Sequence, residues 1–117
     1  MGITNLTQPR ARSRTSASRP APGETIASAS SALEDARGEI SAIDSRLVSL
    51  IAERARIARE IGREKRSLGM TLLDPAREAA VVRRAGELAR ESGVDAEAIR
   101  TIFWQLIALS RNVQSEP

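Results

Sequence analysis

The sequence predicts an all-α protein with one long helix and two shorter helices in each chain. Apolar residues recur at heptad spacing between Leu33 and Leu68, which is typical of a helix that packs against another helix. Two further helix starts follow, at Asp74-Pro75 and at Asp95. Nowhere do apolar and polar residues alternate with the period of two that a half-buried strand needs.

The long helix is expected to begin somewhere in the range 30–35 and to end near Ser67. Ser31 and Glu34 have the spacing of a capping box, and Gly69 suits the left-handed turn that ends many helices. The heptad positions form two neighbouring lines along this helix, apolar except for an arginine and a glutamate: Leu33, Ile40, Leu47, Arg54 and Ile61 on one line, and Ala36, Ile43, Leu50, Ile57 and Glu64 on the other.

A helix from Leu33 to Leu68 is on the order of 50 Å long. A compact domain of this size has a radius of gyration of only about 13 Å, so one chain cannot cover the helix. The two apolar lines therefore predict a second copy of the chain. Arg54 lies within them, and a buried cation needs an anion.

The two shorter helices have clear start and stop signals. Asp74 is a strong N-cap with Pro75 at the first helical position, and 92–93, Ser-Gly, closes this helix. The third helix opens at Asp95 and ends near Gln114. The expected apolar faces are Val81, Val82, Ala85 and Leu88 on the second helix, and Ile99, Ile102, Phe103, Leu106, Ile107 and Val113 on the third.

Residues 1–28 are expected to form a disordered tail, and residues 29–117 a single helical domain. The tail is rich in Ser, Arg and Pro and has almost nothing to bury. A solvated tail, or a start codon placed too early, fits it better than an organelle transit peptide. The tail carries four arginines against one glutamate, whereas the remainder holds 14 cations and 14 carboxylates. Nucleic-acid binding by the domain is therefore not expected, despite the sequence pI of about 10.8.

Composition excludes several classes of chemistry. The chain has no cysteine and no histidine, which excludes Ser-His and Cys-His catalysis and most zinc sites. No apolar run approaches the roughly 20 residues that a membrane span needs. The chain also lacks the apolar core of a secretory signal, so a cytoplasmic location without a membrane partner is expected.

Several polar residues occupy positions that should be apolar. Lys65, the only lysine, follows Arg54 by eleven residues and lies on nearly the same helix face. Ser110 and Gln114 continue the stripe of Leu106 at steps of four. Simple structural explanations exist: a solvated lysine at a helix end, and a buried ion pair between Arg54 and an acid such as those at positions 53 and 78.

Asp74, Arg77 and Glu78 cluster in the first turn of the second helix, where capping and a surface ion pair are a plain explanation. Together with the residues above, however, they predict a cationic cavity with several donors and one carboxylate. Such a cavity suits a small molecule with two carboxylates and a hydroxyl. Arg37 lies 17 residues before Arg54, roughly 25 Å along the helix, and cannot reach the same ligand within its own chain. In an antiparallel dimer it would reach the other chain's site, which gives two equivalent sites.

A set of short segments follows in order along the chain: Arg37 with 40–44 (Ile-Ser-Ala-Ile-Asp), 50–54 (Leu-Ile-Ala-Glu-Arg), 61–62 (Ile-Gly) with Lys65, 74–78 (Asp-Pro-Ala-Arg-Glu), 102–103 (Ile-Phe), 110–111 (Ser-Arg) and Gln114. As an ordered set they resemble the all-helical chorismate mutases, from about Leu33 to Gln114. The resemblance implies an intertwined homodimer whose long helices cross between protomers. It also implies the Claisen rearrangement of chorismate to prephenate, a shikimate-pathway step toward phenylalanine and tyrosine, without a covalent intermediate, metal or cofactor.

The resemblance also implies roles for individual residues. Arg54, with Arg37 of the partner subunit, would hold the two carboxylates of chorismate. Lys65 and Gln114 would donate hydrogen bonds to the ether oxygen, where negative charge develops during bond breaking. Glu78 would accept a hydrogen bond from the ring hydroxyl. Supporting roles fall to Asp74, which would fix the loop, Ser110, which would help one carboxylate, and Arg77, which would add positive field or hold Glu78.

Three alternatives remain open from the sequence alone. Relatives act on 4-amino-4-deoxychorismate, whose amine is compatible with Glu78, and others cleave isochorismate to salicylate and pyruvate. Asp74 and Glu78 match the mutase pattern better than the lyase pattern. A non-catalytic helical dimerisation module, or a regulatory domain of a larger enzyme, would explain the apolar lines but not Arg54, Ser110 and Gln114. Docking to another shikimate-pathway enzyme leaves no visible signal in the sequence.

Overall fold

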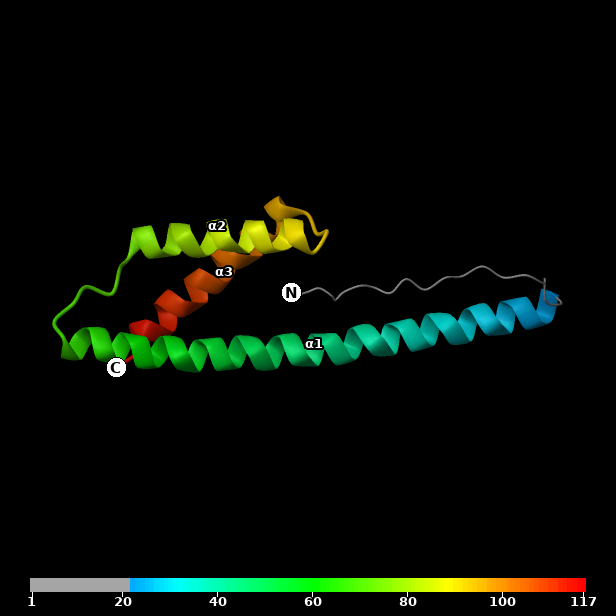
Figure 1. The fold of residues 1–117 in the computed structure, drawn as a ribbon. Helices are drawn as coiled ribbons and strands as arrows, with labels where there is room; N and C mark the ends of the chain where they lie inside the picture. The colour runs from blue at the N-terminus through cyan, green and yellow to red at the C-terminus, as the bar shows by residue number, and fades with distance from the viewer. Residues whose placement is uncertain (1–21) are drawn as a thin grey trace, which may run out of the picture. The chain divides into compact units, whose positions relative to one another are not determined.

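The computed structural model describes residues 22–117, with side chains from Thr25 onward, and this part of the chain is helical without strands, which confirms the all-α prediction. Helix α1 spans Pro22–Ser67, α2 spans Pro75–Glu91 and α3 spans Ala96–Gln114 (Figure 1). The chain divides into two units, one up to Ser41 and one from Ala42 to Pro117, and α1 continues from the first into the second. Within the second unit the chain reverses direction after α1 and again after α2 (Figure 1).

Helix α1 begins at Pro22, earlier than the range 30–35 expected from the sequence, so that prediction was wrong. Proline is tolerated at the first helical position because its missing N–H would have no partner there. The alanines and serines that follow extend an existing helix cheaply, because each added residue gains one hydrogen bond without a new nucleation step. Residues 22–28 of the expected tail thus belong to α1, and residues 1–21 lie outside the described residues.

The C-termini of α1 and α2 follow the glycine signals in the sequence. Gly69 has a positive φ of 70°, and its N–H donates to the carbonyl of Arg66 at 3.2 Å. The next N–H, of Met70, donates to the carbonyl of Lys65 at 2.8 Å. This pair of bonds is the Schellman motif, which satisfies carbonyls that the helix leaves unpaired. Gly93, with φ of 74°, ends α2 in the same way.

The N-termini of α2 and α3 are capped by the aspartates expected from the sequence. The Asp74 side chain accepts a hydrogen bond from the backbone N–H of Arg77 at 3.1 Å. The Asp95 side chain accepts one from the backbone N–H of Glu97 at 3.3 Å. Each carboxylate satisfies a donor that the helix leaves free, and this confirms both predicted helix starts.

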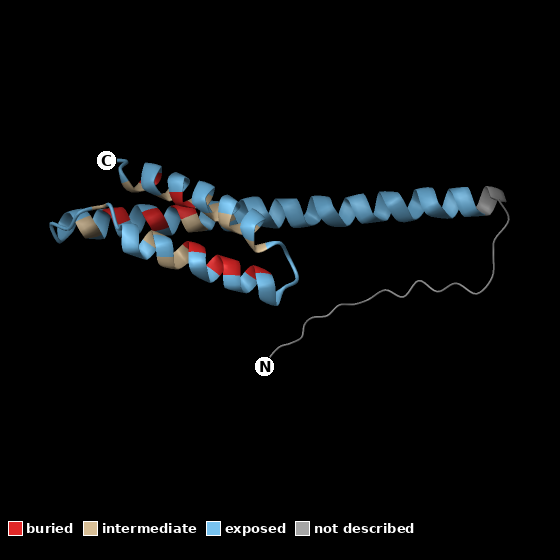
Figure 2. Cartoon of the chain, turned by 90° about the horizontal axis from the view of Figure 1, so that it is seen from above, coloured by how far each residue is buried: buried red, intermediate tan, exposed pale blue. Residues whose placement is uncertain are grey.

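The core of the second unit is built mainly from small side chains. Ala55 and Ala58 of α1 pack with Val113 of α3. The buried apolar residues are Ala55, Ala58, Val82, Ala85, Ala89, Ile107 and Val113. Figure 2 shows buried positions, coloured red, on all three helices of this unit. Leu88 and Ile102 were expected on buried faces but remain 45% and 51% exposed.

The heptad lines of α1 remain exposed in the single chain. Ile40, Leu47 and Leu50 are exposed by 60%, 50% and 58%. No large side chain among the described residues is completely buried, so this chain leaves much of its apolar surface in contact with water. Contiguous exposed apolar surface of this kind marks an interaction site.

Candidate active site

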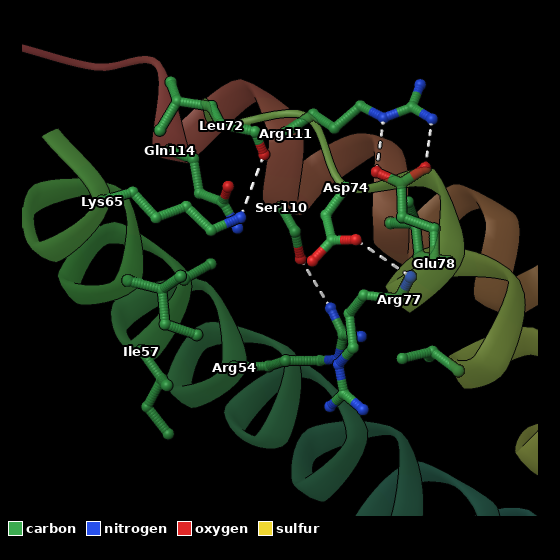
Figure 3. Close-up of a pocket in the computed structure, with 14 residues that line it drawn as sticks. Arg54, Ile57, Lys65, Leu72, Asp74, Arg77, Glu78, Ser110, Arg111 and Gln114 are labelled. Atoms are coloured by element: carbon green, nitrogen blue, oxygen red, sulfur yellow. Dashed lines mark hydrogen bonds and ion pairs between the residues drawn. The ribbon is translucent and has the colours of Figure 1, made fainter. Parts of the chain in front are cut away.

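A pocket of about 450 Å³ opens in the second unit, between the C-terminal part of α1, the segment before α2, and both shorter helices (Figure 3). Seven of the eight site residues predicted from the sequence line it. The polar lining comprises Arg54, Lys65, Asp74, Arg77, Glu78, Ser110, Arg111 and Gln114, and the apolar lining comprises Ile57, Ala58, Ile61, Leu72, Val81 and Ile107.

Arg54 is half-buried, and its Nη1 donates a hydrogen bond to the Ser110 hydroxyl at 2.6 Å. The ion pair with position 53 or 78 that could have explained this arginine does not form. Among the residues that the structure describes, no carboxylate lies within ion-pair distance of Arg54. A partly desolvated guanidinium with only a hydroxyl partner is well placed to receive an anion.

Lys65 points from α1 into the same pocket, and its Nζ donates to the backbone carbonyl of Leu72 at 3.1 Å (Figure 3). An ammonium group has three donors, so at least one remains for a ligand. The simple explanation of a fully solvated lysine fails, because this side chain is half-buried and held by a carbonyl. The sequence did not reveal Leu72, because a backbone acceptor in a loop leaves no signal in residue type.

Asp74 and Arg77 shape the rim of the pocket from the start of α2. The Asp74 carboxylate is engaged in capping the helix, as expected for the residue that fixes this loop. The guanidinium of Arg77 has no carboxylate partner among the described side chains. Arg77 therefore adds positive charge to the pocket.

Glu78 is held by Arg111 of α3, and the alternative expectation, that Arg77 holds it, was wrong. The Nε of Arg111 donates to Oε2 of Glu78 at 2.9 Å, and its Nη2 donates to Oε1 (Figure 3). Arg111 was not among the predicted site residues, although it follows Ile107 by four positions on α3. That spacing of four residues is the signal in the sequence that points to Arg111, because Ile107 lies on the face of α3 that lines the pocket.

The ion pair changes the acid–base behaviour of both groups. Hydrogen bonding from Arg111 lowers the pKa of Glu78 below its ordinary value of 4.5, burial opposes this, and the charges of Arg111 and Lys65 add to the lowering. The hydrogen bond to Glu78 in turn raises the pKa of Arg111. Glu78 is therefore an ionised acceptor at neutral pH.

The charges that line the pocket do not balance. Four cations, Arg54, Lys65, Arg77 and Arg111, face two carboxylates, Asp74 and Glu78. The lining carries a net charge of +2, which complements a dianion.

Gln114 enters the pocket from the last turn of α3, where α3 approaches α1 closely. A Cβ on Gly62 would lie 2.6 Å from the carbonyl oxygen of Gln114 and 2.9 Å from its Cα. The absence of a side chain at Gly62 is therefore required for this approach. Arg66 of α1 donates to the same carbonyl at 2.6 Å, so two residues of α1 contact the backbone of Gln114.

Arg37 is the predicted site residue that does not belong to the second unit. Its side chain is 66% exposed and forms an ion pair with Glu34, one turn earlier, at 3.6 Å. Exposed ion pairs of this kind contribute little to stability, so Arg37 can exchange Glu34 for another carboxylate at low cost. Its predicted role at the site of a partner subunit remains a prediction.

The described residues hold neither a membrane span nor a metal cluster. No helix there is both long enough and apolar enough to cross a membrane. No group of three or more acidic, histidine or cysteine side chains there could hold a metal ion.

Comparison with known proteins identifies the family. The family model for chorismate mutase type II matches residues 36–115. A chorismate mutase of Methanocaldococcus jannaschii is 33% identical over 84 residues, which cover 72% of this chain and 85% of that protein. The T-protein of Haemophilus influenzae is 31% identical over 72 residues, which cover 62% of this chain but only 19% of that protein.

The match covers most of the described chain and includes every predicted site residue, from Arg37 to Gln114. The chain therefore belongs to the chorismate mutase type II family. This confirms the resemblance and the predicted function, that of a chorismate mutase, which is an isomerase.

Proposed function

We propose that this chorismate mutase accelerates the rearrangement by holding the substrate in a compact conformation and by stabilising charge at the ether oxygen. In the reaction one C–O bond breaks as one C–C bond forms, and no proton enters or leaves. Arg54 receives one substrate carboxylate, and Ser110 orients its guanidinium through the 2.6 Å hydrogen bond. Fixing two reacting ends in contact removes much of the entropic barrier.

Lys65 and Gln114 are proposed to donate to the ether oxygen as negative charge develops on it. The Leu72 carbonyl holds the Lys65 ammonium, and the close approach at Gly62 fixes the backbone from which the Gln114 side chain extends. Donors that are already oriented need no rearrangement in the transition state, which is why such groups lower barriers.

Glu78 is proposed to accept a hydrogen bond from the ring hydroxyl. Its lowered pKa keeps it ionised, and therefore an acceptor, at neutral pH. Arg77 supplies further positive charge at the rim, and Asp74 fixes the segment that leads into α2.

The second carboxylate is proposed to bind Arg37 of the partner subunit in an intertwined homodimer. The support is the exposed apolar surface of α1, on which Ile40, Leu47 and Leu50 are all at least half exposed in one chain. A long helix with such a surface is stabilised by packing against a second copy, and two-fold symmetry then gives two equivalent sites.

The observation that carries the proposal is the charge of the pocket. Arg54, Lys65 and Arg77 have no carboxylate partner among the described residues, and the lining has a net charge of +2. Chorismate carries two negative charges. A dimerisation module would gain nothing from cations that remain unpaired beside apolar side chains.

The experiment follows the loss of chorismate absorbance with purified protein, for the wild type and for Lys65→Ala. The variant should lose about a hundredfold to a thousandfold in kcat, the effect of removing one donor to a developing oxyanion. Arg63→Ala, which removes an exposed cation two residues away, is the matched control and should keep wild-type kcat. Normal kcat in Lys65→Ala would contradict the assigned role of Lys65. A wild type inactive on chorismate but active on the 4-amino analogue would instead identify the other substrate.

A further inference from the structure

Arg111 binds Glu78 in a way that uses both carboxylate oxygens. Its Nε donates to Oε2 at 2.9 Å and its Nη2 donates to Oε1, in the parallel geometry that suits a guanidinium and a carboxylate. The Glu78 side chain is only 15% exposed, whereas that of Arg111 is 53% exposed. The arginine thus lies on the outer side of a carboxylate that lines the pocket.

We infer that Arg111 is a positioning residue that makes Glu78 selective for a ring hydroxyl over a ring ammonium. This inference rests on the proposed contact between Glu78 and the ring substituent of the substrate. It assigns to Arg111 the choice between chorismate and its 4-amino analogue, which the site residues named above do not explain.

The pairing with Arg111 changes the charge that Glu78 presents to a ligand. A carboxylate that is already paired with a guanidinium presents little net negative charge to a ligand. It can still accept a hydrogen bond, because each oxygen keeps a second lone pair after accepting from Arg111. A hydroxyl needs only that acceptor, whereas an ammonium also needs an uncompensated negative charge to offset its desolvation.

The charged groups around Glu78 are mostly cationic. Lys65 faces it from α1, Arg111 from α3, and Asp74 and Arg77 line the same pocket from the start of α2. The Asp74 carboxylate offsets only one of these cations. A ligand ammonium placed at Glu78 would therefore meet positive charge, and like charges at close range are unfavourable.

The two substrates also differ in total charge. Chorismate has two carboxylates and no cation, a net charge of −2, while the amino analogue carries an ammonium and a net charge of −1. The lining has a net charge of +2, to which Arg111 contributes one unit. Removal of Arg111 lowers the positive charge of the site by one unit, which weakens binding of the dianionic chorismate more than binding of the analogue.

The experiment compares kcat/KM for chorismate and for 4-amino-4-deoxychorismate in the wild type and in Arg111→Leu. The ratio should shift toward the amino analogue by about tenfold, the factor that corresponds to one modest charge interaction. Arg111→Lys retains the charge but not the two-point geometry, so its ratio should stay nearer to the wild type. Arg84→Leu is the matched control: Arg84 also pairs with a glutamate, is 58% exposed, and lies outside the pocket lining.

A second readout is the pH dependence of kcat/KM for chorismate. Without Arg111 the pKa of Glu78 loses its main lowering influence, while burial still raises it. The acidic limb of the profile should therefore move to higher pH in Arg111→Leu and stay in place in Arg84→Leu. A purely structural role for Arg111 would lower activity without moving this limb.

Glu78→Gln separates the possible failures. In that background a further Arg111→Leu change should alter the substrate ratio much less than it does in the wild type, because the carboxylate through which Arg111 mainly acts is gone. An unchanged ratio and pH limb in Arg111→Leu alone would overturn the inference while leaving the activity of the wild type intact. If Arg111→Leu does not fold, Arg111→Gln, which keeps a donor but not the charge, gives the same two readouts. A wild type without mutase activity would refute the proposed function itself.

Discussion

The two halves of α1 have the same heptad pattern but different surroundings. Residues 25–50 are all exposed, although their apolar positions include Ile40 and Leu47. From Ile51 onward the helix contributes Ala55 and Ala58 to the core. Figure 2 shows this change along a single continuous helix.

The difference teaches that α1 packs through two sets of positions. The apolar residues on its heptad lines stay exposed along both halves, whereas Ala55 and Ala58, which are buried in the later half, lie off those lines. The later half packs against α3 of its own chain through small residues, which allows the close approach at Gly62. The earlier half has larger apolar residues that remain exposed, and it carries Arg37. The first half is therefore expected to need a second chain, and the first three of the four predictions below test that division.

The largest effect is expected from a charge placed on the exposed half. Leu47→Glu should abolish dimer formation and reduce activity to near background, because a buried carboxylate costs roughly several kcal/mol and both sites lose Arg37. Sedimentation velocity and chorismate turnover measure the two effects. Val48→Glu, at a neighbouring position off the heptad lines that is 67% exposed, is the control and should remain dimeric. A monomeric wild type would contradict the division of α1 into two halves.

The next effect comes from mixing two inactive variants. Arg37→Ala and Arg54→Ala should each lose most activity alone. After subunit exchange, half of the dimers are mixed and hold one complete site each, so activity should return to about a quarter of the wild type. Native mass spectrometry verifies the exchange. Mixed dimers without any recovery would show that Arg37 does not act across chains.

A smaller effect, on stability, is expected when alanine replaces one or the other of two glycines in α1. Gly62→Ala should destabilise the protein by about 1–3 kcal/mol and lower kcat, because its Cβ meets the backbone of Gln114. A Cβ on Gly38 would meet no atom within 4 Å, so Gly38→Ala should stabilise by about 0.5–1 kcal/mol through helix propensity. Chemical denaturation measures both changes. Equal effects at the two positions would contradict the contrast between the halves.

The smallest effect is on stability in acid. The pKa of Glu78 is lowered in the folded state, so its ion pair with Arg111 stabilises the protein above about pH 4.5. That contribution is lost as the pH falls through the lowered pKa. Thermal unfolding between pH 3 and 7 should therefore show a steeper acid loss for the wild type than for Glu78→Gln. Parallel curves for the two proteins would argue against the ion pair in solution.

Much of the fold could be predicted because its signals are local. Asp74 and Asp95 cap the helices that they precede, and Gly69 and Gly93 end helices in the left-handed turn that glycine permits. The start of α1 was missed because no single residue forbids extension of a helix through alanines and serines.

The candidate site was less completely predictable. Arg54, Lys65, Ser110 and Gln114 could be found because polar residues on an apolar stripe stand out. Arg111 was missed, because its spacing of four residues from Ile107 becomes informative only once that face of α3 is known to line the pocket. Its partner lies 33 residues earlier in the chain.

The sequence by itself determined three helices, most of their ends, and a set of cations that one family uses with a dianionic substrate. Only the tertiary structure decided that Arg111 holds Glu78, that a loop carbonyl holds Lys65, and that α3 approaches α1 at Gly62. The physical reason is the distance along the chain between the residues that interact. Capping and helix termination depend on neighbours within one turn, whereas these contacts depend on which faces of distant helices meet.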